Sequence, residues 1–209
     1  MGGREPTVAR FGYSATERIG ARLKRETAAL HRHLEERLGL VDAGLSLGRY
    51  QRVLESFFGY FAPVEARIEA LAPSALPLGF EVPARAQLLA ADLVALGSSV
   101  SRVAALPRCT DLPRLAEPAH LAGCLYVLEG SRLGAPIVAL ELERSLGVGY
   151  DGAAFFRGDG EDVTRRWKRV LGWLDEVARS GARADEMVAS ACETFRTLSR
   201  WTEARGAWR

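Results

Sequence analysis

Apolar residues recur at intervals of three and four along most of the chain, which is the spacing of one face of an α-helix. The first run consists of Ile19, Leu23, Leu30, Leu34 and Leu38. Ser14 and Glu17 have capping-box spacing and Gly39 supplies a stop, so a helix is expected over 15–38. Residues 1–13 show no such period and are expected to form a loose arm.

The same periodicity, bounded by proline and glycine, predicts further helices downstream. They are expected over 46–72, ended by Pro73, and over 83–96, 118–146, 160–180 and 183–204, with a shorter turn near 99–106. No segment alternates with period two over the length of a strand. We therefore expect an all-α fold with a single domain over 14–209, in its simplest form an up-and-down bundle.

Composition restricts the function more than the fold. The chain has 209 residues, 48% of them hydrophobic and 26% charged, which is typical of a globular protein and not of a disordered one. Its net charge of +2 is spread along the sequence, so neither nucleic-acid nor membrane binding is indicated. Small-molecule chemistry becomes the favoured class.

Two further features bear on where the protein works. The three cysteines, Cys109, Cys124 and Cys192, lie far apart without a C-x-x-C motif, which favours a reducing, cytoplasmic location. The longest apolar stretch, 121–142, contains Glu129, Arg132 and Glu141, so no membrane span is expected.

A candidate ligand group lies on the first helix. Thr27, His31 and Glu35 are spaced four apart, and Lys24 lies two turns before His31, so one face carries a cation, an imidazole and a carboxylate. Such a histidine can bind a metal or a heme iron, with the carboxylate orienting its ring. The alternative, more common for a lone helical histidine, is a residue without a ligand.

A second candidate is a set of glycines inside the predicted helix over 118–146. Gly123, Gly130 and Gly134 have offsets of seven and four, which place them on one face. Each glycine costs a helix about 0.5–1 kcal/mol relative to alanine, so something is expected to approach this backbone closely. Two explanations remain open, namely tight packing against another helix or a flat ligand lying on the bare backbone.

Three stretches of the chain resemble the heme oxygenase family. Residues 23–31, continuing to Glu35, resemble its first-helix motif T-x-x-x-H-x-x-x-E. Residues 126–135, YVLEGSRLGA, are similar to its glycine-bearing distal helix, most closely in the bacterial form associated with bacteriophytochromes. The pair at 155–156, Phe-Phe, followed by Trp-Lys at 167–168, resembles a third family segment. The resemblance implies a single-domain heme-oxygenase-like helical bundle.

The resemblance also implies roles for individual residues. His31 would ligate the heme iron, and the catalytic residues on the opposite side would be Gly130, Ser131 and Gly134. Heme-binding positions would be Lys24, Thr27, Glu35, Gly123, Val127, Ala135, Lys168 and Phe195. Lys24 and Lys168 are the only lysines, and they fall where the family neutralises the heme propionates.

Three positions depart from the family pattern. Ala135 replaces the second glycine of a Gly-Gly pair, and Ser131 stands where many members have an aspartate, although bacterial relatives carry serine. Gly172 occupies a position that is arginine in animal members. These departures bear on the distal pocket and on the propionate contacts.

The implied activity is the opening of heme b, both substrate and cofactor, to biliverdin, with O₂ consumed and carbon monoxide and ferrous iron released. No Rossmann or flavin motif is present, so electrons are expected from an external ferredoxin, flavodoxin or reductase. A bacteriophytochrome is suggested as the biliverdin acceptor. The alternatives are a heme carrier or sensor that does not degrade its ligand, and a helical interaction domain without a ligand.

Overall fold

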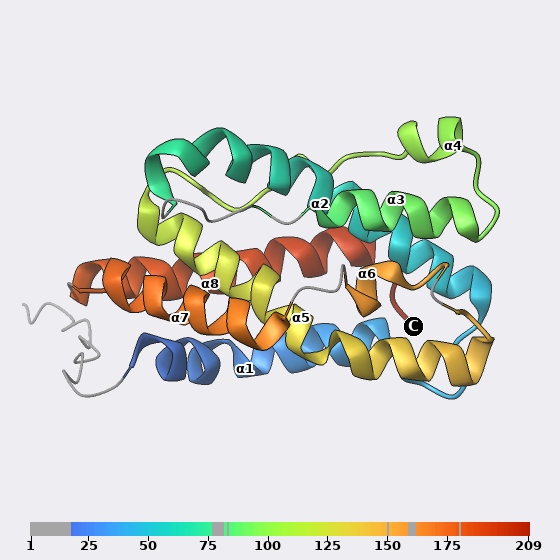
Figure 1. Cartoon of the computed structure of the whole chain (residues 1–209), viewed down its shortest axis with the longest axis horizontal. Helices are drawn as coiled ribbons and strands as arrows, with labels where there is room; N and C mark the ends of the chain where they lie inside the picture. Colours follow the sequence, from blue (N-terminus) through green and yellow to red (C-terminus); the bar gives the residue numbers. More distant parts are fainter. Residues whose placement is uncertain (1–17, 77–81, 83, 150, 159–161, 180) are drawn as a thin grey trace, which may run out of the picture.

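The computed structural model describes residues 18–76, 82, 84–149, 151–158, 162–179 and 181–209, and all regular structure in these ranges is helical (Figure 1). The helices are α1 (Ile19–Leu38), α2 (Leu47–Ala75), α3 (Arg85–Ala95), α4 (Val100–Ala104), α5 (Pro118–Leu146), α6 (Ala154–Arg157), α7 (Val163–Val177) and α8 (Gly181–Ala204). The expectation of an all-α fold is confirmed. None of the described helices combines the length and hydrophobicity that a membrane span requires.

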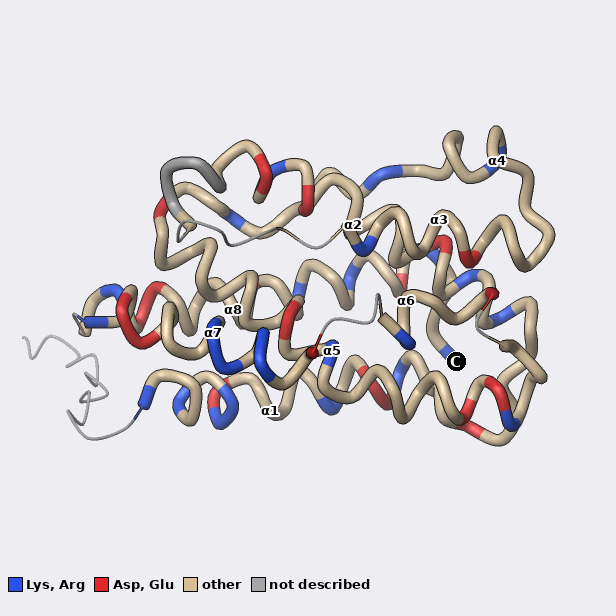
Figure 2. The backbone as a smooth tube through the Cα atoms, viewed as in Figure 1, with Lys and Arg blue, Asp and Glu red and all other residues tan. Residues whose placement is uncertain are grey.

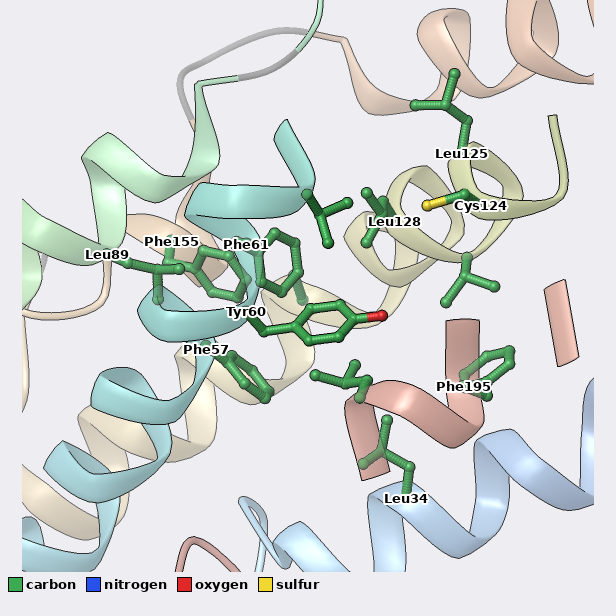
Figure 3. Packing of buried hydrophobic residues seen from close by; sticks show 14 of the residues in the cluster. Leu34, Phe57, Tyr60, Phe61, Leu89, Cys124, Leu125, Leu128, Phe155 and Phe195 are labelled. Atoms are coloured by element: carbon green, nitrogen blue, oxygen red, sulfur yellow. The ribbon is translucent and has the colours of Figure 1, made fainter. Parts of the chain in front are cut away.

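Helix α8 lies at the centre of the bundle. It packs against α1, α2 and α5, while α7 covers α1 and α5, and α3 covers α2 (Figure 1). The core between these helices is formed by aliphatic and aromatic side chains, among them Phe61, Leu125 and Phe155 (Figure 3). The fully buried Tyr60 lies among them, and its hydroxyl is 2.7 Å from the hydroxyl of Thr197 on α8.

Several helix boundaries differ from the expected ones by a few residues, and two of the differences have a clear physical reason. Helix α1 begins at Ile19, because Arg18 is extended (φ −63°, ψ 140°), so the expected start at residue 15 is wrong. Helix α2 continues to Ala75, past Pro73, because a proline removes one hydrogen bond yet keeps a helical φ. The expected arm over 1–13 and the capping box of Ser14 and Glu17 lie outside the described residues.

The short helix α6 was not expected from the sequence. Its first N–H groups, those of Ala154 and Phe155, donate to the carboxylate of Asp92 at 2.7 and 2.9 Å. Asp92 is buried on α3, so the cap comes from a residue far away in the sequence. A helix of one turn depends on such a partner, because its few internal hydrogen bonds do not offset the cost of nucleation.

Helix α5 is the longest continuous feature near the candidate residues. Pro118 lies in its first turn and Gly147 ends it with φ 65°, as the sequence predicts. Pro136 lies inside the helix and provides no N–H for the carbonyl of Arg132. Figure 1 shows α5 changing direction along its length, in keeping with this interruption.

The segment after α8 folds back onto the end of α1. The Trp208 ring contacts the ring of His33 edge-on at 5.5 Å, and the guanidinium carbon of Arg37 lies 4.6 Å from the Trp208 ring centre. Arg209 pairs with Asp42 at 2.9 Å, just beyond α1. The last turn of α1 is thereby held against the last turn of α8.

Glu65 of α2 is a buried carboxylate at the start of α3. It accepts a hydrogen bond from the backbone N–H of Ala86 at 3.1 Å. Burial raises its pKa to about 7, although this hydrogen bond and the nearby Arg85 lower it in part. The folded state therefore binds a proton that the unfolded chain releases near pH 4.5, so this group makes folding less favourable as pH rises from about 4.5 to 7.

We predict that Glu65→Gln removes this pH dependence. The amide oxygen still accepts from Ala86, but no charge has to be buried, so above pH 7 the variant is expected to be more stable by up to about 3 kcal/mol. Urea unfolding of both proteins between pH 5 and 8 measures the difference. Glu69→Gln, one turn further on α2 and exposed, is the control. The prediction would be contradicted if the free energies of unfolding of the wild type and Glu65→Gln changed with pH in the same way.

Candidate functional site

The three residues of the first-helix motif lie together on α1. The His31 side chain is 50% exposed, and its Nε2 atom is 3.4 Å from Oε1 of Glu35. The Phe195 ring from α8 contacts the imidazole edge-on at 5.7 Å, with an angle of 71° between the rings. These two contacts therefore orient an imidazole that remains open to solvent.

Thr27 lies between α1 and α5. Its hydroxyl is buried, donates to the carbonyl of Leu23 at 2.7 Å and lies beside the hydroxyl of Tyr126 of α5. Burial raises the pKa of Tyr126, and the neighbouring Thr27 hydroxyl lowers it in part. Both helices run in the same direction in Figure 1. One turn beyond this contact the two helices therefore present His31 and Gly130, respectively.

Beyond Tyr126, one side of α5 becomes open to solvent. Gly130, Leu133, Gly134 and Ile137 follow the i, i+3, i+4, i+7 spacing of a single helix face, and we call them the open face of α5. Leu133 is 46% exposed and Ile137 is 71% exposed. A Cβ atom added at Gly134 would have no neighbour within 4 Å. An apolar surface with bare backbone at its centre suits a flat, apolar ligand.

The three glycines that share a face in sequence have different neighbours in the structure. A Cβ atom at Gly123 would collide with the backbone carbonyl of Met187 and lie 2.8 Å from the backbone nitrogen of Ala191, both on α8. At Gly130 the nearest atom would be in the Trp167 ring, 3.4 Å away. Tight helix packing, one of the two explanations open from the sequence, therefore accounts for Gly123, and only Gly130 and Gly134 reach the open face.

Two other predicted heme-binding positions on α5 are buried. Val127 and Ala135 are 6% and 7% exposed and belong to the hydrophobic core. Neither side chain therefore contributes to the exposed surface of the open face. The predicted distal segment therefore divides into residues that form a surface and residues that support it.

Helix α7 borders the open face and carries the second lysine. The Trp167 ring packs at 5.6 Å from the Tyr126 ring and lies next to Gly130. Lys168 follows Trp167 and is exposed, as is Lys24 on α1. Figure 2 shows basic residues on α1 and on the adjoining α7. Cations are thus available beside an apolar surface, which suits a ligand with anionic groups on one edge.

A buried ion cluster, which was not expected from the sequence, fixes α5 to α7. The Glu129 side chain is 2% exposed and accepts two hydrogen bonds from Arg166, at 2.7 and 2.8 Å. Arg132 approaches the same carboxylate at 3.4 Å. Glu129 and Arg166 lie 37 positions apart, so the only local signal was a charged residue, Glu129, within the apolar helix α5.

Ser131 faces α3, at the edge of the open face. Its hydroxyl accepts a hydrogen bond from Arg85 at 2.9 Å and donates one to the carbonyl of Leu128 at 2.8 Å. On the far side of Arg85 lies a cleft of about 220 Å³, lined in part by Gln87, Arg132 and Gly158. Arg85 was missed from the sequence because nothing in its segment distinguishes it from the many surface arginines.

Comparison with models of protein families identifies one family. The family model described as heme oxygenase matches residues 17–204. None of the curated proteins matches the chain by sequence. Among solved structures, heme oxygenase from Leptospira interrogans is similar at 18% identity and a TM-score of 0.70, covering 90% of this chain and 100% of that one.

Two more solved structures share the fold. Heme oxygenase-1 from the cyanobacterium Synechocystis, in complex with heme, is 14% identical with a TM-score of 0.74, covering 90% of this chain and 92% of that one. A domain of unknown function from Shewanella denitrificans, described as having a heme oxygenase-like fold, is 13% identical with a TM-score of 0.73, covering 92% and 93%. At these identities the similarity concerns the fold alone.

The different neighbours of the glycines predict different effects of alanine substitution. Gly123→Ala forces a methyl group against the backbone of α8 and is expected to destabilise the ligand-free protein by about 1–3 kcal/mol. Gly134→Ala meets no atom and is expected to stabilise it by about 0.5–1 kcal/mol, because alanine favours the helix. Chemical denaturation measures both. Equal effects at the two positions would refute this assignment.

Proposed function

Because the chain belongs to the heme oxygenase family, we propose that it opens heme to biliverdin with O₂ and external electrons, releasing carbon monoxide and ferrous iron. The observation that carries the proposal is the arrangement of α1 and α5 beyond the contact between Thr27 and Tyr126. It provides an exposed, oriented imidazole on one helix and an apolar face with bare backbone on the other.

The residues present fit a heme group. A porphyrin is flat and apolar, with two carboxylates on one edge and a metal at its centre. The open face of α5 offers Leu133 and Ile137 for apolar contact, and Gly134 has space above its backbone. The imidazole of His31 is a nitrogen ligand of the type that heme iron accepts. When bound, heme supplies the iron that activates oxygen and the ring that is oxidised.

On the α1 side, His31 would hold the iron through the ring nitrogen that does not face Glu35. The carboxylate of Glu35 would keep the proton on the other nitrogen and make the imidazole a stronger donor. Phe195 limits rotation of the ring by contacting its edge. Thr27, one turn earlier, maintains the distance between the two helices through Tyr126.

On the α5 side, Gly130 and Gly134 would leave room for oxygen and water between the backbone and the ring. Neither residue places a side chain there, so no acidic group of the open face can donate a proton directly. The Ser131 hydroxyl at the edge of this space would hold a water molecule, which would take over the role of the missing acidic group. Gly123, Val127 and Ala135, which are buried, would support the open face by their packing in the core.

The two lysines would bind the anionic edge. Lys24 and Lys168 are exposed and lie on the neighbouring helices α1 and α7. Lys24 comes three residues before Thr27, and Lys168 directly follows Trp167. Their ammonium groups would neutralise the propionates and so select one orientation of the ring in its plane. Gly172, exposed and without neighbours for an added Cβ atom, contributes no cation to this edge.

The proposal includes partners. Electrons would come from a ferredoxin, a flavodoxin or a reductase. They are needed because the O₂ consumed takes up more electrons than the oxidation of the heme ring supplies. A bacteriophytochrome is the proposed acceptor of the pigment, on the similarity of residues 126–135 alone. Three unpaired, buried cysteines support a reducing, cytoplasmic location.

A carrier or sensor that binds heme without degrading it is the second candidate function. The similarity to the Shewanella domain of unknown function shows that this fold is not restricted to proteins with a named activity. Ala135 and Ser131 are the positions that depart from the family pattern. An assay of turnover separates the two candidates.

We predict that the protein binds hemin in a histidine-ligated form and, with O₂ and a reductant, converts its Soret absorption into a bile-pigment spectrum. Chromatography identifies the product. His31→Ala is expected to lose the histidine-ligated spectrum, whereas His33→Ala, whose ring packs against Trp208, keeps it. Stable heme binding without pigment would support a carrier instead. An unchanged spectrum of His31→Ala would exclude His31 as the iron ligand.

Side-chain size at Gly134 is expected to control turnover. Gly134→Leu fills the space above the backbone, so turnover is expected to fall by at least about a hundredfold, while the ligand-free protein folds normally. Gly134→Ala, the matched control, should retain most of the activity. The initial rate of pigment formation measures both variants. Full turnover by the leucine variant would mean that oxygen does not occupy this space.

A further inference from the structure

Arg85 is a buried cation whose position is fixed from several directions. Its Nη1 atom donates to the Leu128 carbonyl and to the Ser131 hydroxyl, both at 2.9 Å. The guanidinium carbon lies 4.0 Å from the ring centre of Phe155 and 4.9 Å from that of Phe61. Contact with two aromatic rings restricts a planar guanidinium far more than a flexible ammonium. Arg85 therefore presents its N–H groups to α5 at a defined place.

The helix that carries Arg85 is itself anchored at its start. The Glu65 carboxylate from α2 accepts the N–H of Ala86, the residue after Arg85. The same carboxylate borders a small cavity together with Arg85 and Glu129. The position of Arg85 is thus set by α2, α5 and α6 together, and not by the local sequence of α3.

These contacts determine what the Ser131 hydroxyl can do. A serine hydroxyl has one hydrogen to donate and two lone pairs to accept with. Its hydrogen is used on the Leu128 carbonyl and one lone pair is used by Arg85. These are the two hydrogen bonds that the Ser131 hydroxyl makes with the described residues, so its oxygen has one lone pair left to accept another bond. A water molecule at Ser131 must then donate to it, which leaves the second hydrogen of that water available for another acceptor.

We propose that Arg85 is the positioning residue of the distal side: it holds the Ser131 hydroxyl as a pure acceptor, so that bound water points a hydrogen into the space beside Gly130 and Gly134. The proposal rests on the proposed function, in which that space receives oxygen. Without Arg85 the hydroxyl can rotate and accept or donate, and the water loses its fixed orientation. Arg85 acts through Ser131 and does not touch the substrate.

A double-mutant cycle tests the coupling between the two residues. The proteins are the wild type, Arg85→Gln, Ser131→Ala and the double variant, with Gln87→Ala on the same helix as the control. Each single variant is expected to lower the rate of pigment formation about tenfold, and the double variant no further than either one. Gln87→Ala should match the wild type. A purely structural Arg85 would give additive effects, since its loss would cost the same in either background.

A second readout uses the ligand-free protein. The same cycle in urea is expected to show coupling of about fivefold in the unfolding equilibrium constant, because the two side chains share a hydrogen bond. Arg85→Lys, which keeps the charge, is the variant to use if Arg85→Gln does not fold. It is expected to recover part of the turnover but not all of it.

The outcomes separate this proposal from the one on which it rests. If the wild type binds hemin and forms no pigment, the proposed function fails and the role of Arg85 in it fails as well. If the wild type forms pigment and the effects of Arg85→Gln and Ser131→Ala are additive, only the role of Arg85 is overturned. Coupling in both readouts supports the positioning of Ser131 by Arg85.

Discussion

The close approach of α5 to α8 at Gly123 determines where the rest of the site lies. The two backbones come so near that no side chain fits between them, and this contact sets the position of α5 along its neighbour. Tyr126, less than one turn later, then reaches Thr27 of α1. Beyond that point one side of α5 is no longer covered, and Gly134 and Ile137 on that side are open to solvent. One helix therefore packs into the core along its whole length and carries the open face on one side of its second half.

The rotation of α5 about its own axis depends on a different interaction. Glu129 is buried with Arg166 and Arg132, on the side of α5 away from Gly134. Burying such charges adds little net stability, but removing one partner of a buried pair typically costs about 3–5 kcal/mol. Rotating α5 would separate the carboxylate from Arg166, so the cluster opposes any rotation that would turn the open face inward.

Much of the architecture follows from local sequence. The helix boundaries set by Pro118 and Gly147, and the common face of His31 and Glu35, depend on periodicity and on residues within one or two turns. These properties need no knowledge of the fold, because helical geometry alone places the residues. The resemblance of the segments around His31 and Gly130 to a known family then added what local geometry lacks, namely that the two helices act together.

The remainder could not be predicted because it depends on contacts between distant segments. Gly123 and Gly130 are equivalent on a helical wheel, yet one meets the α8 backbone and the other a Trp167 ring. The cap of α6 is supplied by Asp92, and the partner of Ser131 by Arg85, 46 positions earlier. In each case the residue types are ordinary, and only the tertiary arrangement gives them a specific role.

The association of α1 with α8 has a consequence for how the chain acquires its final shape. Arg22 of α1 pairs with Asp185 of α8 at 2.6 Å across 163 positions of sequence, and Phe195 follows on the same helix. During translation the part of the apolar stripe of α1 that packs on α8 consequently remains uncovered until α8 has been synthesised. The contact between Phe195 and the imidazole can form only after that point, so a shorter nascent chain carries His31 without the aromatic ring that orients it.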